Sequence, residues 1–405
     1  MIWFEWKKIF GRRLNIIAMI SGYVLIAVCM FNYITQERFY DKTTDTYLEG
    51  MESFSRSREQ AAQQTKIITD EYITQLVQQI QNYQLDLERD DAYMEVIRPL
   101  GDIFYFTVKN YTDMREEIID NNVLNAIDLS KGAQFYKQRM AKIKDYLNMD
   151  FSSGNYKEAE KQYWIQKAEN VEVPFRWGSK REMSTIWEII NIGFYLVFVI
   201  IICVSPVFAS EYESGAAALL LTTKFGKNRL IYTKILASVI FTVGYLTLGN
   251  LLAVATIGLL LGFHGADLPV QLWNSVIPYS MNAAQVCLLT FVIILLISIT
   301  IALFLLCCSA GLRSSLAVLV IGVTIMIAPA FFPMSKESGL WNHLNYLFPV
   351  RAIDVKEMLG SFVSYTVGNF VISYLAMVVI VYTAVSAAAL AFTRKGFVRG
   401  SLRGK

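Results

Sequence analysis

The sequence predicts an all-α polytopic membrane protein with six transmembrane helices and a large helical extracellular domain between the first and second of them. Two observations predict this fold. The chain of 405 residues is 54% hydrophobic, with a mean hydropathy of +0.39, which is too apolar for a soluble domain of this length. Its apolar residues are gathered in runs of roughly 20 residues with few charges, the length that crosses a bilayer as a helix. The net charge of +3 is modest, so no nucleic-acid partner is implied.

Residues 1–13 are expected to form an amphipathic helix that lies in the membrane interface, because aromatic side chains favour the depth of the lipid headgroups. Three aromatic residues fall on one helical face and two basic residues on the opposite face, namely Trp3, Trp6 and Phe10, and Lys8 and Arg12. An ordinary charged flank of the first span would give the same pattern. Residues 14–34 form the first transmembrane helix, an uncleaved signal anchor, since no small-residue cleavage site follows them.

Residues 35–182 differ in character from the rest of the chain. Acidic residues outnumber basic ones there by about six, as on a solvated surface. Apolar residues recur at helical spacing in three sets, Ile68, Tyr72, Leu76, Ile80, Tyr83 and Leu87, then Tyr136, Met140, Ile143 and Leu147, then Tyr156, Tyr163 and Trp164. Strand alternation is not sustained. We expect an extracellular all-helical domain of about 145 residues, enough for its own core; a stalk-like helical hairpin over residues 45–90 is an alternative.

Residues 183–405 are predicted to hold the second to sixth transmembrane helices. The apolar runs place them at 185–207, 235–261, 284–308, 316–332 and 370–392. The connection at 334–365 is amphipathic, broken at Pro349 and too polar to span. It is expected to dip into the outer leaflet as a re-entrant-like segment covered by protein. A plain interfacial loop that carries short helices is the alternative.

The basic residues of the termini and short loops predict the orientation. If the spans alternate from a cytoplasmic amino terminus, one side receives most of them, and the other short loops receive Lys336, Arg351 and Lys356. The cytoplasmic set is Lys7, Lys8, Arg12, Arg13, Lys224, Lys227, Arg229, Lys234, Arg313, Arg394, Lys395, Arg399, Arg403 and Lys405. This bias places both termini in the cytoplasm of a multi-pass cell-membrane protein. A cysteine-free outer domain fits a Gram-positive bacterial surface.

The residues that carry catalytic or metal chemistry are sparse. All five cysteines lie in apolar runs, so neither a disulfide framework nor a metal site is expected. We find no GxxxxGK[ST] phosphate loop, no HExxH and no GxSxG motif. We therefore expect a protein that is not an enzyme by itself, with no catalytic residues and no cofactor of its own.

Three polar residues in the predicted spans are candidates for a transport pathway. Glu188 is the only ionisable residue clearly inside a span, and an intramembrane carboxylate is a functional candidate by default. Its position near the outer end of the second span equally suits a side chain that reaches the surface. Asn191 and Asn250 could line the same path, and hydrogen bonding between helices is their more ordinary role.

The segment after the second span is predicted to form a short cytoplasmic helix over 208–226. Ser210 and Glu213 have the spacing of a capping box, and a run of small residues and leucines follows from Ala216 to Leu221. Gly226 supplies a helix stop before the third span.

This pattern resembles the permease subunits of ATP-binding-cassette (ABC) transporters of the type-2 permease family. That family has six spans with both termini inside, an amphipathic amino-terminal helix, and broken helices between the fifth and sixth spans. Its cytoplasmic helix after the second span often reads as phenylalanine, acid, small residues and glycine, leucines and then a basic residue. The matching residues are Phe208, Glu211, Gly215, Leu220, Leu221, Arg229 and Lys234. The family's proline is missing from residues 222–226, and the resemblance covers about 1–34 and 183–405.

The resemblance implies that a separate cytoplasmic ABC ATPase docks on this coupling helix. The residues it assigns to coupling are Phe208, Glu211, Glu213, Gly215, Leu220, Leu221 and Arg229. ATP and Mg would be bound by that partner, and a second permease chain, identical or homologous, would pair with this one in the membrane lipid. The expected function is export of a peptide, a drug or another envelope-active molecule. The alternative is a membrane-anchored sensor or assembly scaffold whose extracellular domain binds a partner.

Overall fold

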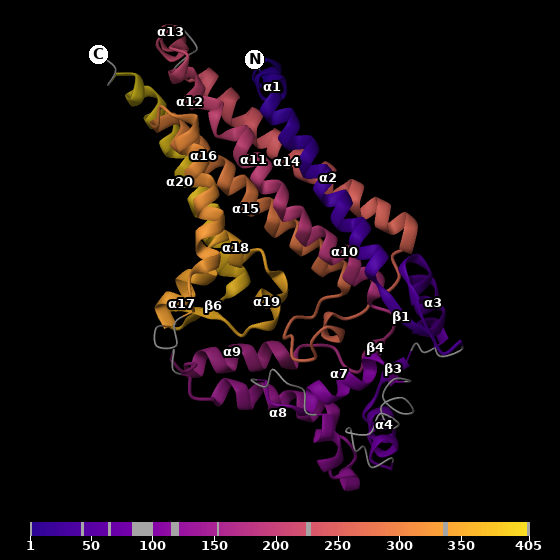
Figure 1. The fold of residues 1–405 in the computed structure, drawn as a ribbon. Coiled ribbons are helices and arrows are strands. Elements are labelled where there is room, and N and C mark those ends of the chain that lie inside the picture. Colours follow the sequence, from indigo (N-terminus) through magenta and orange to yellow (C-terminus); the bar gives the residue numbers. More distant parts are fainter. Residues whose placement is uncertain are drawn as a thin grey trace.

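The computed structural model is mostly helical. It describes residues 2–41, 44–63, 66–82, 100–114, 121–151, 154–223, 228–334 and 339–402. Figure 1 shows a bundle of long helices with α1 (Ile2–Gly11), α13 (Ala216–Thr222) and the last turns of α20 (Tyr374–Leu402) at one end, which we call the termini end. The opposite end carries a group of shorter elements, and we call it the domain end.

Within the described residues, five helical stretches are long and apolar enough to cross a membrane. They are α2 (Arg13–Gln36), the stretch Arg181–Glu213, α14 (Arg229–Leu261), α15 (Ala283–Gly311) and residues Tyr374–Val398 of α20. The second stretch joins α10 (Arg181–Ile192), the 3-10 turn η4 (Gly193–Tyr195), α11 (Leu196–Val204) and α12 (Pro206–Glu213). The prediction of a mainly helical, polytopic membrane architecture is confirmed at this level.

The run predicted to be the fifth span, 316–332, forms the apolar stretch Ser315–Phe331, in which a short helix is followed by a 3-10 turn. The helix α16 (Ser315–Ile327) has 13 residues and continues into the 3-10 turn η6 (Ala328–Phe331). At 1.5 Å per residue, α16 rises about 20 Å, against a hydrocarbon core of about 30 Å. Pro329, buried in η6, ends the regular helix because it lacks a backbone N–H. The apolar stretch Ser315–Phe331 is therefore too short to be one of the five.

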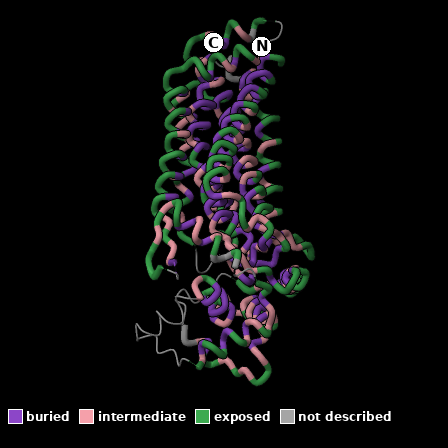
Figure 2. Tube along the Cα trace, turned by 90° about the vertical axis from the view of Figure 1, so that its right-hand side faces the viewer, coloured by how far each residue is buried: buried purple, intermediate pink, exposed green. Residues whose placement is uncertain are grey.

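Helix α15 is the central element of the bundle. It packs against α10, α11, α12, α14, α16 and α20. Residues along its length are fully buried, among them Ile297, Ala302 and Leu306. Figure 2 shows buried residues on the inward faces of the long helices and exposed residues along the outside of the bundle. In a chain this apolar, that outside surface suits lipid rather than water.

Part of the domain end has a hydrophobic core of its own, whereas buried residues of its other helices belong to the core of the bundle. The domain end contains α3 (Gly50–Gln63), α4 (Asp70–Asn82), α7 (Asp102–Tyr111), α8 (Phe135–Asn148), α9 (Glu158–Glu169) and the 3-10 turns η2 (Asn121–Ala126) and η3 (Leu129–Lys131). Ile73, Val77, Phe104 and Phe135 are fully buried there. The first predicted set lies on α4 except for Ile68, which is in a strand, and for Tyr83 and Leu87, which fall outside the described residues. The second set lies on α8, and Tyr163 and Trp164 of the third lie on α9. Helix α3 packs on α2 and α14 while α4 joins the core, so the described part of 45–90 is not a single hairpin.

The prediction of an all-helical domain is wrong in one respect, because short antiparallel strands are present. β1 (Arg38–Asp41) pairs with β2 (Thr46–Glu49), and β3 (Lys66–Ile68) pairs with β4 (Phe175–Trp177). A third hairpin, β5 (Ser364–Val367) and β6 (Phe370–Ser373), precedes α20. The two residues between them are Gly368, with φ +62°, and Asn369, which suit a tight hairpin turn. The last long helix consequently begins at Tyr374 and not at residue 370.

The segment predicted to be re-entrant forms three short helices at the domain end. They are α17 (Gly339–Tyr346), α18 (Pro349–Ala352) and α19 (Val355–Gly360), and residues 335–338 lie outside the described chain. α18 packs on α16 and η6, and α19 packs on α15 and α20. These helices therefore fill the space that the short α16 leaves beside α15 and α20.

Two side chains fasten the domain to the loops of the bundle. Arg139 of α8 is 2% exposed, and its guanidinium donates to the carbonyl oxygens of Ser275 at 2.5 Å, Ala168 at 3.3 Å and Ile277 at 3.3 Å. Trp164 of α9 is 1% exposed and stacks edge-on against Phe362, which precedes β5. The domain thus contacts both the loop before α15 and the segment before α20.

Candidate functional site

The candidate site lies at the termini end, where α1 crosses α12 and α14. Trp6 donates its indole N–H to the Ala237 carbonyl at 3.1 Å, and Phe10 meets Phe241 edge to face at 5.8 Å. At the bend after α1, the amide of Asn15 donates to the Ile9 carbonyl at 2.8 Å. Trp6 and Phe10 thereby hold one side of α1 against α14. The side chains of Trp3 and Phe4 remain 64% and 70% exposed.

A buried ion-pair cluster joins the three helices. Lys234 of α14 is 1% exposed, and its ammonium lies 2.9 Å from Glu5 Oε2 of α1 and 2.8 Å from Glu211 Oε1 of α12. The same ammonium donates to the Val207 carbonyl at 3.0 Å. All three protons of a lysine ammonium therefore have acceptors. Because an unpaired ammonium is costly at this depth, the contacts fix the relative positions of α1, α12 and α14.

Lys8 completes the cluster from its exposed side. Its ammonium lies 2.7 Å from Glu211 Oε1 and 3.5 Å from Glu5 Oε1. Partial burial lowers the Lys8 pKa, but the hydrogen bonds and negative charges of Glu211 and Glu5 outweigh that effect and raise the pKa overall. Two carboxylates thus face two ammonium groups, and the four charges balance within the cluster.

Helix α12 is also fixed to the far side of the bundle. Phe208 is fully buried, and its ring packs on Phe397 of α20 at 4.9 Å. The backbone N–H groups of Phe208 and Ala209 donate to the Ser309 hydroxyl of α15, at 3.1 and 2.9 Å. Tyr212 donates to the Ala310 carbonyl at 3.0 Å. Helix α12 therefore touches α1, α14, α15 and α20 within two turns.

The predicted coupling helix over 208–226 is instead two helices. Ser210 and Glu213 lie inside α12, so the capping box predicted from their spacing does not form. Glu213 accepts from the backbone N–H of Ser315 at 2.6 Å, and so it caps the start of α16. Gly215 has φ +74° and turns the chain between α12 and α13, where a side chain would be strained.

Helix α13 extends from the termini end of the bundle (Figure 1). Leu219 is 73% exposed, whereas Ala217 is 4% exposed and faces the protein; Leu220 is half-buried. Leu221 lies in the helix, and its side chain is outside the described part, as are residues 224–226. Arg229 is exposed at the first turn of α14. The structure therefore separates the predicted coupling residues into a buried anchor on α12 and an exposed tip on α13.

The three predicted pathway residues do not join this site. Glu188 lies on an exposed face of α10, and Asn191 donates to the Trp187 carbonyl one turn earlier at 3.2 Å. Asn250 is 3% exposed and packs on Gly193, where an added Cβ would meet its Oδ1 at 2.6 Å. Its Oδ1 has no described hydrogen-bond partner. Asn250 thus contacts the 3-10 turn η4, and the three side chains do not converge on one cavity.

Sequence reasoning missed the cluster itself. Glu5 and Lys8 are predicted only as part of an interfacial helix, and Lys234 only as a cytoplasmic basic residue that matches the basic position of the permease-like pattern. The usable signal was the position of Lys234 six residues inside a helix that is otherwise apolar, since such a charge needs a buried partner. The partners come from 229 and 23 residues away in the chain, and spacing does not reveal them.

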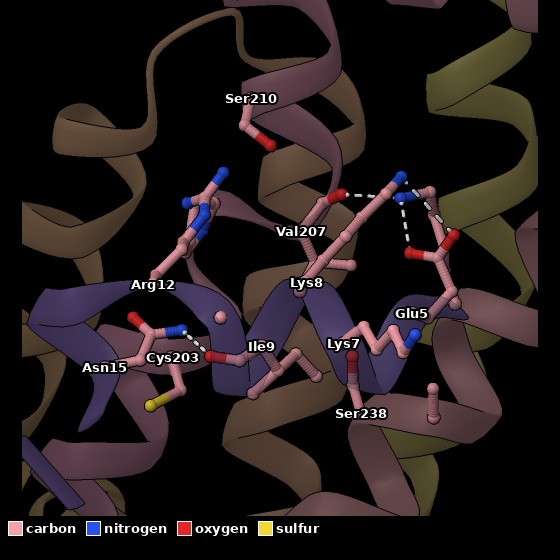
Figure 3. Close-up of a pocket in the computed structure, with 14 residues that line it drawn as sticks. Glu5, Lys7, Lys8, Ile9, Arg12, Asn15, Cys203, Val207, Ser210 and Ser238 are labelled. Carbon is pink, nitrogen blue, oxygen red and sulfur yellow. Dashed lines mark hydrogen bonds and ion pairs between the residues drawn. The ribbon is translucent and has the colours of Figure 1, made fainter. Parts of the chain in front are cut away.

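A cavity of about 330 Å³ lies beside the cluster, between α1, α12 and α14 (Figure 3). Its lining includes Lys8, Arg12, Ser210 and Ser238. Within the described chain, no group of three or more His, Cys, Asp or Glu side chains is placed to hold a metal ion. Because ion pairs join α12 to α1 and α14, a displacement of α12 can pass directly to both helices.

Compared with models of protein families, with curated proteins and with solved structures, the chain matches none.

Proposed function

We propose that this chain is the membrane-spanning permease subunit of an ABC transporter, an exporter driven by a separate cytoplasmic ATPase. In this proposal α13 and the exposed end of α12 form the docking surface for that ATPase. The proposal includes six spans. The fifth span consists of α16 and η6, and α17 and α18 complete it. It also places both termini in the cytoplasm and the domain end outside the cell.

The observation that carries the proposal is the Lys234 cluster. A protein that receives a push from a partner needs the contacted element tied firmly to several spans. Helix α12 meets that need through ion pairs to α1 and α14 and through hydrogen bonds to α15. A protein that only anchors an outer domain has no such need at the termini end, and this favours the exporter over the sensor or scaffold.

The exposed tip supports a docking role. Leu219 is a large apolar side chain that is exposed on a helix extending from the bundle, so it is accessible to a partner that docks there. It lies a few residues beyond the buried anchor, so force applied at the tip reaches the cluster through Gly215 and α12. A second copy of the chain would complete the transport path in the membrane.

The experiment is purification of the tagged chain from its native membrane in mild detergent, followed by measurement of ATP hydrolysis and identification of the retained subunits. We expect an ATPase subunit to co-purify and to account for the hydrolysis. Leu219→Asp should reduce both by more than about tenfold, since a buried interface anchor contributes about 2 kcal/mol or more. Val367→Asp, at an exposed apolar position of the domain end, is the matched control and should leave both unchanged.

Hydrolysis that persists in the isolated single chain would contradict the proposal. So would a native assembly without any nucleotide-hydrolysing subunit, and that result would favour the sensor or scaffold.

A further inference from the structure

The cavity beside the Lys234 cluster has features that the cluster does not use. Its volume of about 330 Å³ falls at the lower end of the range for small-molecule sites. Lys8 and Arg12 lie four residues apart, and Figure 3 shows both side chains rising from the same side of α1, Arg12 toward the part of α12 that carries Ser210. The cavity is thus walled by cations on α1 and by α12 and α14 on its other sides.

The charges around the cavity do not cancel. Glu5 and Glu211 are matched by Lys8 and Lys234, as the ion-pair distances show. Arg12 lines the cavity as an additional cation, and within the described chain neither a hydrogen bond nor an ion pair engages its guanidinium. Lys7 also lines the cavity, and its ammonium lies over the Trp3 ring at 5.8 Å. The site therefore has an excess of positive charge, which attracts an anion.

A buried hydroxyl provides a second, independent sign of a ligand. Ser238 of α14 is 0% exposed, and its Oγ has no described hydrogen-bond partner. Figure 3 shows this hydroxyl pointing toward α1, on the wall of the cavity. A serine hydroxyl in an apolar helix can donate to the carbonyl one turn earlier, as Ser205 does here to Ile201 at 2.6 Å. A buried hydroxyl without such a bond is free to donate to a ligand oxygen.

The depth of the cavity indicates where that ligand comes from. Trp3 and Phe4 are exposed on α1, and Leu14 and Ile17 are exposed at the start of α2. Exposed aromatic residues next to an exposed apolar helix mark the headgroup layer of a bilayer. Ile9, Cys203 and Ala237 give the cavity an apolar part beside its cations. An anion that carries its own apolar tail suits both parts.

We propose that this cavity binds the phosphate headgroup of an anionic membrane lipid. Arg12 would pair with the phosphate, and Ser238 and Ser210 would donate hydrogen bonds to its oxygens. Arginine and lysine are the residues that recognise phosphate by charge-assisted hydrogen bonds. A bound headgroup would touch α1, α12 and α14 at once, next to the Lys234 cluster. The inference requires only that α1 lies at a membrane surface, and it does not depend on transport or on an ATPase.

The test is native mass spectrometry of the delipidated full chain in detergent, titrated with phosphatidylglycerol or phosphatidylcholine. We expect one phosphatidylglycerol to bind about tenfold more tightly than phosphatidylcholine. Arg12→Gln should weaken that binding about five- to tenfold, since one cation near a lipid surface contributes a factor of this order. Ser238→Ala should weaken it to a smaller degree, and Arg12→Lys should retain most of it. Arg13→Gln, a neighbouring cation that does not line the cavity, should match wild type.

Three results would overturn the inference. Equal affinity for the two lipids would show that the headgroup charge is not recognised. Equal losses in Arg12→Gln and Arg13→Gln would show general attraction to a basic segment rather than a site. Displacement of phosphatidylglycerol by an equal concentration of inorganic phosphate would show that a free anion, and not a lipid, is the ligand.

Discussion

The two ends of the bundle are fastened by different chemistry. At the termini end, α1, α12 and α14 meet through a lysine that is 1% exposed and two carboxylates that are each 6% exposed. At the domain end, Arg139 is buried to a similar degree, but its guanidinium donates to backbone carbonyl oxygens, and Trp164 packs among aromatic rings. Burial lowers the pKa of Arg139 to about 10, and among the described residues its guanidinium has no carboxylate partner.

The two kinds of contact predict different responses of the two ends to displacement. A buried ion pair is costly once its partners separate, because a desolvated charge is left behind. Each apolar atom–atom contact contributes only about 0.1–0.2 kcal/mol, so a small shift at the domain end breaks no single strong interaction and leaves no charge unpaired. The termini end is therefore expected to move as one unit, while the domain end is expected to yield locally.

Lys234→Met is expected to have the largest effect and tests the ion-pair cluster at the termini end. This change leaves Glu5 and Glu211 buried without their shared partner, and removing one member of a buried pair costs about 3–5 kcal/mol. We expect a large fall in the thermal unfolding temperature, measured by tryptophan fluorescence in detergent. A variant that also carries Glu5→Gln and Glu211→Gln should recover most of the loss, since no uncompensated charge remains. Equal stability of the single and triple variants would contradict the buried cluster.

Arg139→Met tests the other end and should have a smaller effect. The carbonyl oxygens of Ser275, Ile277 and Ala168 lose their donors, and unsatisfied buried acceptors cost about 1–3 kcal/mol. Removal of the desolvated charge offsets part of that cost. We expect faster hydrogen exchange in peptides from residues 270–282, with exchange in α12 and α14 unchanged. Exchange that rises equally at both ends would show that the ends are not independent.

Gly215→Ala tests the turn between the anchor and the tip. An added Cβ meets no other atom within 4 Å, so its cost comes from the backbone at φ +74° and is about 1–2 kcal/mol. Gly244→Ala is the matched control, because that glycine is helical and also has open space around it. It should be neutral or slightly stabilising, since alanine favours helix. A thermal shift of the same sign and size in both variants would rule out strain at Gly215.

Lys8→Gln should have the smallest effect and a distinctive pH dependence. Lys8 is half-exposed, so solvent screening limits its contribution to less than about 1 kcal/mol. Its pKa is raised in the folded protein above the ordinary value of 10.5, so its stabilisation is fully present below that value and is lost as the pH rises further. The stability difference between variant and wild type should therefore be constant at pH 7–9 and disappear above pH 10.5. A difference that grows in alkali would contradict the assigned partners.

The long helices could be predicted from the sequence because an apolar run of about 20 residues has few other structures available in a membrane. The helices of the domain could be predicted because their apolar residues recur at helical spacing, as Leu76 and Ile80 do. The strands were missed because each has only three or four residues, too few for alternation to be visible. The bounds predicted for the fifth span, 316–332, agree with the apolar stretch Ser315–Phe331 within one residue, but hydropathy does not register that its last four residues form a 3-10 turn at Pro329.

The candidate site could be predicted only in part. The region after the second span was identified, and Phe208 and Glu211 lie in it. The Lys234 cluster was not predicted, because its members are brought together only where α1 crosses α12 and α14 in the folded protein. Hydrophobic periodicity specifies which face of a helix is buried but does not specify which distant charge meets it. The helix that was predicted to be continuous is interrupted at Gly215, because the backbone there has a positive φ. That angle is a property of the folded backbone.

The proposed function requires a nucleotide-hydrolysing partner that acts on the tip of α13. The most direct measurement is photo-crosslinking from a benzoylphenylalanine placed at Leu219 in native membranes, with the same probe at Val367 as control. We expect the probe at position 219 to crosslink this chain to an ATPase subunit, and the probe at position 367 to give no such crosslink. An adduct from position 219 only with polypeptides that do not bind nucleotide, or only with lipid, would contradict the proposed function.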